Sequence, residues 1–155
     1  MASIYSLQQI QLIPATLEEV WHFFATANNL ARLTPAYMRF RVTSAPYHGH
    51  IYAGQFITYL VSPVPGIPLE WVTEITQVQP LSYFVDEQRV GPYRMWHHQH
   101  HFEAVPGGVR MTDTVHYRLP LGVLGKLAHY LWVKRQLDGI FSYRKTAVEQ
   151  HFGRM

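Results

Sequence analysis

The chain has 155 residues, of which 48% are hydrophobic and 15% are charged. That balance is typical of one folded domain, which we expect to span residues 1–155. A formal charge of +3 is too small to indicate a nucleic-acid-binding surface. Because the sequence has no cysteine, disulfides, thiol nucleophiles and thiolate metal sites are excluded.

The N-terminal part of the chain predicts one strand followed by two short helices. The strand is expected over residues 3–13. Thr16 and Glu19 then have the spacing of a capping box, in which the threonine hydroxyl accepts from the Glu19 amide and the glutamate reaches back. The first helix should begin there, and a second short helix is expected over residues 30–33.

The middle of the chain predicts six strands, because apolar and polar residues alternate there with a period of two. The expected strands are 37–43, 55–61, 69–78, 82–88, 93–105 and 109–119. Short turns between them favour an antiparallel meander. The proline-rich segment 63–68 is expected to form a rigid connection that carries no ladder hydrogen bonds.

Residues 122–152 predict a long C-terminal helix. Apolar side chains recur there at spacings of three, four or seven, which marks one apolar face; they are Leu127, Leu131, Leu137, Phe141, Val148 and Phe152. Charged residues, Arg144 among them, fill much of the remaining surface. Gly139 indicates a bend or a close contact. Because an isolated helix is marginal in water, the apolar face must pack on the sheet.

The segment Trp96–Glu103 contains four histidines and is the strongest candidate for a functional site. On a strand, Trp96, His98, His100 and Phe102 share one face, because successive side chains point to opposite sides. Two large rings bound this face, which favours its pointing inward. Two imidazoles would then enter a partly apolar space.

The next strand brings a carboxylate to the same face. A two-residue turn at Pro106–Gly107 would pair His100 with Asp113, whereas a four-residue turn would shift the register by two and keep the same faces together. In either case Asp113 lies near His98 or His100. A carboxylate in that position raises the pKa of a buried imidazole and fixes its tautomer.

Three interpretations of this cluster remain open: a structural polar pair, a site that orients a ligand in an apolar cavity, and a metal site formed by His98, His100 and Asp113. We predict no tightly bound metal and no cofactor, because only three candidate ligands converge. Asp86 and Glu87 point to opposite faces of one strand, so they are not expected to form a carboxylate pair. No phosphate-binding loop or nucleophile-elbow motif occurs.

Several sequence runs resemble a known superfamily. They are Pro14–Phe24, Asn29-Leu30, Leu33-Thr34-Pro35, Phe84–Gln88, Gly91-Pro92-Tyr93, Trp96-x-His98-x-His100-x-Phe102-Glu103, Thr112-Asp113-x-Val115-x-Tyr117 and Leu119–Gly122. With the element order, these runs resemble the SRPBCC superfamily, the START-like helix-grip proteins related to the birch pollen allergen. The similarity is to a bacterial ligand-binding or cyclase/dehydrase-like subgroup, and a similar domain is fused to nucleotide-sugar epimerase-like proteins.

The resemblance implies an α+β helix-grip fold. A seven-stranded antiparallel sheet would wrap around the long C-terminal helix, with two short helices after the first strand and a cavity between sheet and helix. It also implies a soluble, cytoplasmic binding protein for a small hydrophobic molecule such as a lipid, a polyketide or an aromatic compound. We expect the partner to be that ligand, with no nucleic acid and no integral membrane segment.

Two alternatives stay open, because fold does not fix function. One is a polyketide cyclase/aromatase-like or hydrolase-like enzyme, with His98 or His100 as general base and Asp113 as its orienting partner. The other is a protein-interaction module without a ligand. The residues expected to contact a ligand are Trp96, His98, His100, Phe102, Asp113, Tyr117, Leu131 and Phe141.

Overall fold

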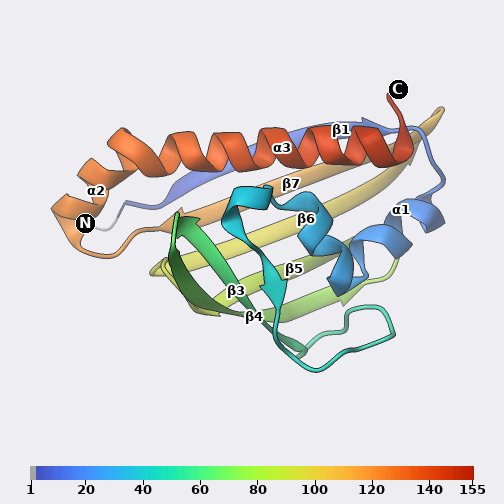
Figure 1. Ribbon diagram of the computed structural model, residues 1–155. Coiled ribbons are helices and arrows are strands. Elements are labelled where there is room, and N and C mark those ends of the chain that lie inside the picture. The colour runs from blue at the N-terminus through green and yellow to red at the C-terminus, as the bar shows by residue number, and fades with distance from the viewer. Residues whose placement is uncertain (1–2) are drawn as a thin grey trace.

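The computed structural model describes residues 3–155, and its centre is a seven-stranded antiparallel sheet with the order β1-β7-β6-β5-β4-β3-β2. The strands are β1 Tyr5–Ile13, β2 Arg41–Val42, β3 Phe56–Val64, β4 Ile67–Gln79, β5 Tyr83–Val90, β6 Met95–Val105 and β7 Gly108–Arg118. The helical elements are α1 Leu17–Phe24, η1 Ala27–Leu33, η2 Ala36–Met38, α2 Gly122–Ala128, η3 His129–Val133 and α3 Lys134–Phe152. The long helix lies along the sheet (Figure 1), which confirms the expected α+β helix-grip fold.

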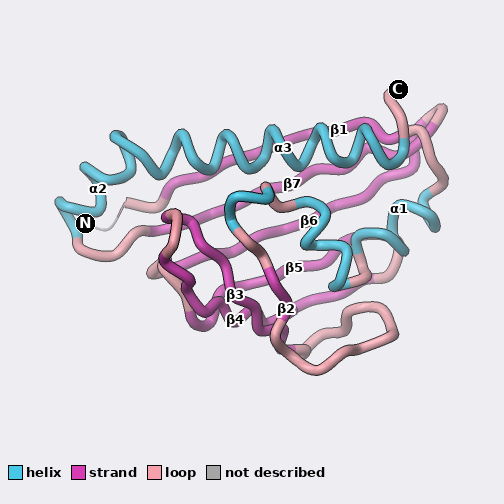
Figure 2. The backbone as a smooth tube through the Cα atoms, in the orientation of Figure 1, coloured by secondary structure: helices cyan, strands magenta, loops and turns pink. Residues whose placement is uncertain are grey.

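The first and last strands are neighbours in the sheet. β1 pairs with β7 from Tyr5↔Tyr117 to Ile13↔Val109, while β3 to β7 follow one another as hairpins (Figure 2). At the start of β7 the backbones approach closely. A Cβ added to Gly108 would lie 2.1 Å from the carbonyl oxygen of Ile13, so only glycine fits there.

The predicted capping box starts α1. The amide of Glu19 donates to Thr16 Oγ1 at 3.2 Å, and Glu19 Oε2 accepts from the Thr16 amide at 2.9 Å. Both bonds satisfy amides that have no partner inside the helix. The second short helix is 3₁₀ rather than α and begins at Ala27, earlier than expected.

Two strand predictions were wrong in detail. Residues 37–43 supply only the two-residue strand β2, because Ala36–Met38 forms a 3₁₀ turn and Arg39 has a left-handed φ of 48°. The segment 63–68 is not a separate connection. β3 and β4 continue into it, Val64 pairs with Ile67 across a tight turn at Pro65-Gly66, and an irregularity between Val61 and Val64 accommodates Pro63.

The C-terminal helix is continuous but changes type, and this corrects the predicted apolar face. Five residues, His129–Val133, form a π-helix between α2 and α3. The wider turn gives the buried positions a spacing of four before Phe141. They are Gly125, His129, Val133, Leu137, Phe141, Arg144 and Val148. Leu127 and Leu131 therefore point outward. Gly139 makes no close contact, because a Cβ there would meet nothing within 4 Å.

The helix–sheet interface has two apolar clusters. The larger joins α1 to the strands and to Val148 of α3, while the smaller packs Val133, Leu137 and Phe141 on Val115 and Tyr117 of β7. Over residues 3–155, every helix is too short or too polar to cross a lipid bilayer. Side chains from both clusters line the cavity described next.

Candidate functional site

Strand β6 carries the two histidines of the candidate site on its inward face. His98 and His100 are 6% and 3% exposed, whereas Trp96 is half-buried. Across the next hairpin, His100 pairs with Asp113 and Phe102 pairs with Met111. The two-residue turn is therefore the one that forms. This confirms that Asp113 lies near the two histidines, and it sets Asp113 opposite His100.

Asp113 joins both imidazoles. His98 Nε2 donates to Asp113 Oδ1 at 2.9 Å, and His100 Nδ1 lies 3.0 Å from the same oxygen. The other His100 ring nitrogen, Nε2, donates to Asp86 Oδ2 at 2.6 Å. Because both nitrogens of His100 face carboxylates, its protonated form is favoured.

Arg144 of α3 closes the cluster from the helix side. Its Nε lies 3.5 Å from Asp113 Oδ2, its guanidinium lies over the Phe24 ring at 5.3 Å, and the residue is only 7% exposed. Two carboxylates thus face one guanidinium and one imidazole that gains a proton readily. Buried charges persist when they are paired in this way.

The pKa values of the cluster follow from burial and these pairings. Burial alone would raise the pKa of Asp113, but Arg144 and the two histidines hold that pKa well below its ordinary value. Burial would lower the pKa of His100, yet its bonds to Asp113 and Asp86 raise it above 6.5. Burial and the neighbouring charge of His100 lower the pKa of His98. The cluster therefore biases the two histidines in opposite directions, His100 toward its protonated form and His98 toward its neutral form.

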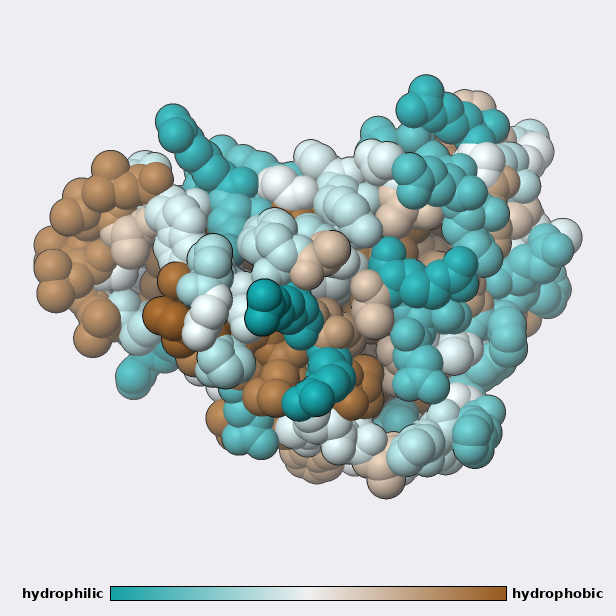
Figure 3. Space-filling view, in the orientation of Figure 1, coloured by the Kyte–Doolittle hydropathy of each residue, from teal (hydrophilic) through white to brown (hydrophobic). Residues whose placement is uncertain are grey.

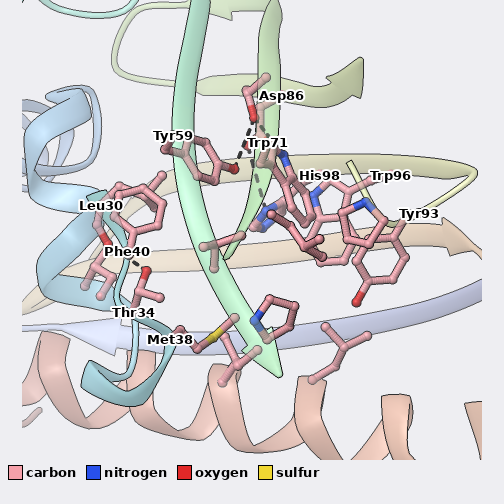
Figure 4. A pocket seen from close by; sticks show the side chains of 18 of the residues that line it. Leu30, Thr34, Met38, Phe40, Tyr59, Trp71, Asp86, Tyr93, Trp96 and His98 are labelled. Carbon is pink, nitrogen blue, oxygen red and sulfur yellow. Dashed lines mark hydrogen bonds and ion pairs between the residues drawn. The ribbon is translucent and has the colours of Figure 1, made fainter. Parts of the chain in front are cut away.

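A cavity of about 430 Å³ lies beside this cluster, between the sheet, η1 and the C-terminal helix. Figure 4 shows rings from three strands grouped around it, namely Tyr59 of β3, Trp71 of β4 and Trp96 of β6. Tyr93, which precedes β6, contributes a fourth ring. Tyr59 Oη and Trp71 Nε1 lie 3.2 and 3.1 Å from Thr73 Oγ1, so their polar atoms are satisfied by the wall itself. Large rings of this kind offer a guest extensive apolar area.

The sequence-predicted site residues divide into three groups. Trp96, His98, His100 and Phe141 line the cavity. Phe102, Asp113 and Tyr117 are buried without lining it. Phe102 packs in the larger core cluster, Asp113 stands behind the histidines, and Tyr117 Oη contacts His129 Nε2 at 2.9 Å. The prediction that Leu131 faces the cavity was wrong, because its side chain is 68% exposed.

Two residues of the cluster were missed. Asp86 lies opposite His98 on β5 and lines the cavity. The alternation of Phe84 and Asp86 on one face of that strand was the available signal. Arg144 was assigned to the wet side of the helix, although its spacing of three from Phe141 and four from Val148 puts it on the buried face.

The cluster also contains a geometry that could hold a metal. Ligand atoms of Asp86, His98 and His100 lie within 4.8 Å of one another. However, Asp86 and both imidazoles already hydrogen-bond to carboxylate or imidazole partners, and the Arg144 guanidinium adds positive charge alongside. These contacts favour protons over a cation, since a metal would need deprotonated, unpaired ligands.

Comparison with known proteins decides the family. The model of the family described as polyketide cyclase/dehydrase and lipid transport matches residues 13–139. The chain belongs to this family. Comparison with curated proteins found no match.

Solved structures of this fold agree over nearly the whole chain. The protein TTHA0849 from Thermus thermophilus is 19% identical with a TM-score of 0.68, covering 96% of this chain and 97% of that protein. A norcoclaurine synthase point mutant from Thalictrum is 14% identical with a TM-score of 0.68, covering 97% of this chain and 98% of that enzyme. A nucleoside-diphosphate sugar epimerase from Corynebacterium glutamicum is 26% identical with a TM-score of 0.65. That match covers 93% of this chain but only 28% of the epimerase.

Proposed function

We propose that this protein binds a small, largely apolar molecule in the cavity between the sheet and the C-terminal helix. The observation that carries the proposal is the composition of the cavity wall. Aromatic and aliphatic side chains cover most of it, and one wall presents Asp86, His98, His100 and Arg144. An apolar guest gains about 25 cal/mol for each Å² removed from water.

The polar wall would give the guest an orientation. A ligand with a matching hydroxyl or carbonyl could pair with His98 or Arg144, whereas one without it would leave buried groups desolvated. Trp96 and Phe141 would contact the apolar part of the guest from the sheet and the helix. The family description, which combines lipid transport with polyketide cyclisation and dehydration, supports a guest of this class.

Native mass spectrometry of protein purified from its own host tests the proposal directly. We expect a bound small molecule that denaturation releases for identification. Titration with that molecule should then change the fluorescence of Trp71 and Trp96, which line the cavity.

A filled-cavity variant makes the test specific. Val61→Phe adds a ring inside the cavity and should lower ligand affinity by about tenfold or more, at a modest cost in stability. Val90→Phe makes the same change at a position on β5 that is 51% exposed and outside the cavity lining, so its affinity should match wild type. Equal affinities for both variants would refute binding in this cavity.

A second candidate function is general-base catalysis on the bound guest, and the state of His98 favours it. With Nε2 donating to Asp113, the neutral ring keeps Nδ1 as a proton acceptor, and Nδ1 lies 3.8 Å from Asp86 Oδ2. A lowered pKa keeps the ring unprotonated at neutral pH. In an enzyme, His98→Ala should abolish turnover while the guest still binds. Release of the guest unchanged from wild type would exclude this alternative.

A further inference from the structure

The N-terminal half of the C-terminal helix exposes an unusual number of large apolar side chains. Leu121, Val123, Leu124, Leu127, Tyr130, Leu131 and Trp132 are between 45% and 80% exposed. Their side chains project from α2 and η3, and from the residue before α2, in several directions. Figure 3 shows a hydrophobic end of the molecule where Figure 1 places α2. We call this set the apolar tip.

The π-helix explains why these residues are not part of the core. Its wider turn directs Gly125, His129 and Val133 at the sheet. Leu127 and Leu131, which a regular apolar stripe would bury, are left 55% and 68% exposed. A group of exposed leucines of this kind indicates a binding surface, because large contiguous apolar patches on monomers usually mark one. π-helices are themselves frequent at functional sites.

A second segment extends the apolar tip. The tight turn between β3 and β4 exposes Val64 and Ile67 by 38% and 53%. Gln136 of α3 ties this turn to the helix through a 2.7 Å hydrogen bond to the carbonyl of Pro63. Val64 lines the same cavity as Leu121, Leu124 and Trp132 of the tip. Both exposed apolar segments therefore border the cavity.

Basic side chains lie beside the tip without acidic ones. A depression against α2 is lined by Arg94, Arg118 and Lys126 together with Leu121 and Val123, and it has no acidic lining residue. Among the described residues, none of these three cations forms an ion pair within 4.0 Å. Along the chain, no aspartate or glutamate occurs between Asp113 and Asp138. The tip thus combines apolar bulk with uncompensated positive charge.

We propose that the apolar tip docks into the interface of an anionic lipid bilayer. Leucine and valine side chains would enter the acyl boundary, Tyr130 and Trp132 would lie at the headgroup level that such rings favour, and the three cations would contact lipid phosphates. This arrangement is that of an interfacial helix that lies in the membrane surface without spanning it. If the proposed function also holds, a guest dissolved in the bilayer could reach the cavity at this end.

Charge complementarity favours a membrane over a second copy of the chain. A twofold dimer through the tip would pair the surface with itself. Arg94, Arg118 and Lys126 would then face the same cations of the other copy, which is unfavourable. An anionic lipid surface neutralises them instead.

Flotation of the purified chain with lipid vesicles tests the proposal without any knowledge of the guest. We expect binding to phosphatidylcholine vesicles that contain phosphatidylglycerol, and much weaker binding to phosphatidylcholine alone or at high salt. The double variant Val123→Asp with Leu127→Asp should weaken partitioning by more than about tenfold. Neither residue lines the cavity, so ligand affinity in solution should not change.

Matched controls separate the two contributions. Ile10→Asp introduces one aspartate, against two in the double variant, at a site on β1 that is 53% exposed. Its vesicle binding should differ from wild type only by the single added charge. Lys126→Gln should weaken binding to anionic vesicles by about fivefold, whereas Lys145→Gln, on α3 away from the tip, should have a smaller effect.

Three outcomes would overturn the proposal. The first is wild-type protein that does not float with anionic vesicles. The second is a Val123/Leu127 double variant that binds as strongly as Ile10→Asp. The third is a dimer in light scattering that the double variant dissociates, which would assign the apolar tip to an interface between two copies.

Discussion

Replacing Arg144 by Met should destabilise the protein strongly. The methionine keeps most of the side-chain volume but removes the guanidinium that, among residues 3–155, faces the buried cluster of Asp113, Asp86 and the two histidines. At the 3.5 Å between Arg144 Nε and Asp113 Oδ2, the charge attraction is about 5 kcal/mol for an effective dielectric constant of about 20. Removing one partner of a buried pair typically costs about 3–5 kcal/mol.

The cost should depend on pH in a defined direction. The pKa of Asp113 is depressed in the folded protein, so its contribution to stability is present above the ordinary value of 3.8 and is lost as pH falls through the folded pKa. Without Arg144 that pKa rises, and the variant can relieve its buried charge by binding a proton. The stability gap between wild type and variant should therefore be largest at neutral pH, and it should narrow as the pH falls through the folded pKa that Asp113 has in the variant.

Urea and thermal unfolding at several pH values provide the assay. At neutral pH we expect the midpoint temperature to fall by about 6–20 °C, at about 2–4 °C for each kcal/mol in a chain of this size. Arg135→Met is the matched control, because Arg135 lies on the exposed side of the same helix, and its effect should stay within about 0.5 kcal/mol. A loss below about 1 kcal/mol for Arg144→Met, with no change in pH profile, would refute the reasoning.

Other predictions follow from single features. Thr16→Ala removes the side-chain acceptor of the capping box and should cost about 1 kcal/mol, measured as a shift in the urea midpoint; an unchanged midpoint would contradict the cap. His100→Gln removes a group whose folded pKa is raised above 6.5. The loss of stability in this variant should be greatest below pH 6.5 and should shrink as pH rises through the folded pKa of His100. A loss that grows with pH would contradict the raised pKa. Elemental analysis of protein purified without a histidine tag should find no stoichiometric metal, whereas zinc that disappears in a His98→Ala variant would assign Asp86, His98 and His100 as its ligands.

Alternation and one turn were sufficient to predict the centre of the site. The faces of β6 followed from a period of two, and a short turn of either two or four residues placed Asp113 near His98 or His100. The structure has the two-residue turn, which sets His100 opposite Asp113. The position of Asp86 could not be predicted in the same way, because the connection between β5 and β6 is longer and does not define the register of the two strands. The pairing of Asp86 with His98 therefore had no signal in turn length.

The helix errors have a separate physical cause. A helical pattern drawn at 3.6 residues per turn assumes one helix type throughout. The π-helix at His129–Val133 adds about one residue to its turn, which changes which residues before it face the sheet. Leu127 and Leu131 were therefore assigned to the wrong side. Arg144 was misassigned for a different reason, since a buried cation on an apolar face is rare unless a carboxylate awaits it.

The adjacency of β1 and β7 also bears on how the chain folds during synthesis. β1 is made first, but its hydrogen-bonding partner begins at Gly108. Until then its ladder groups are unpaired, and the meander from β3 onward must assemble without it. Pairings between such distant segments are slow to form because a long loop has to close first. Until β1 pairs with β7, both strands therefore keep an unpaired edge that is exposed to aggregation.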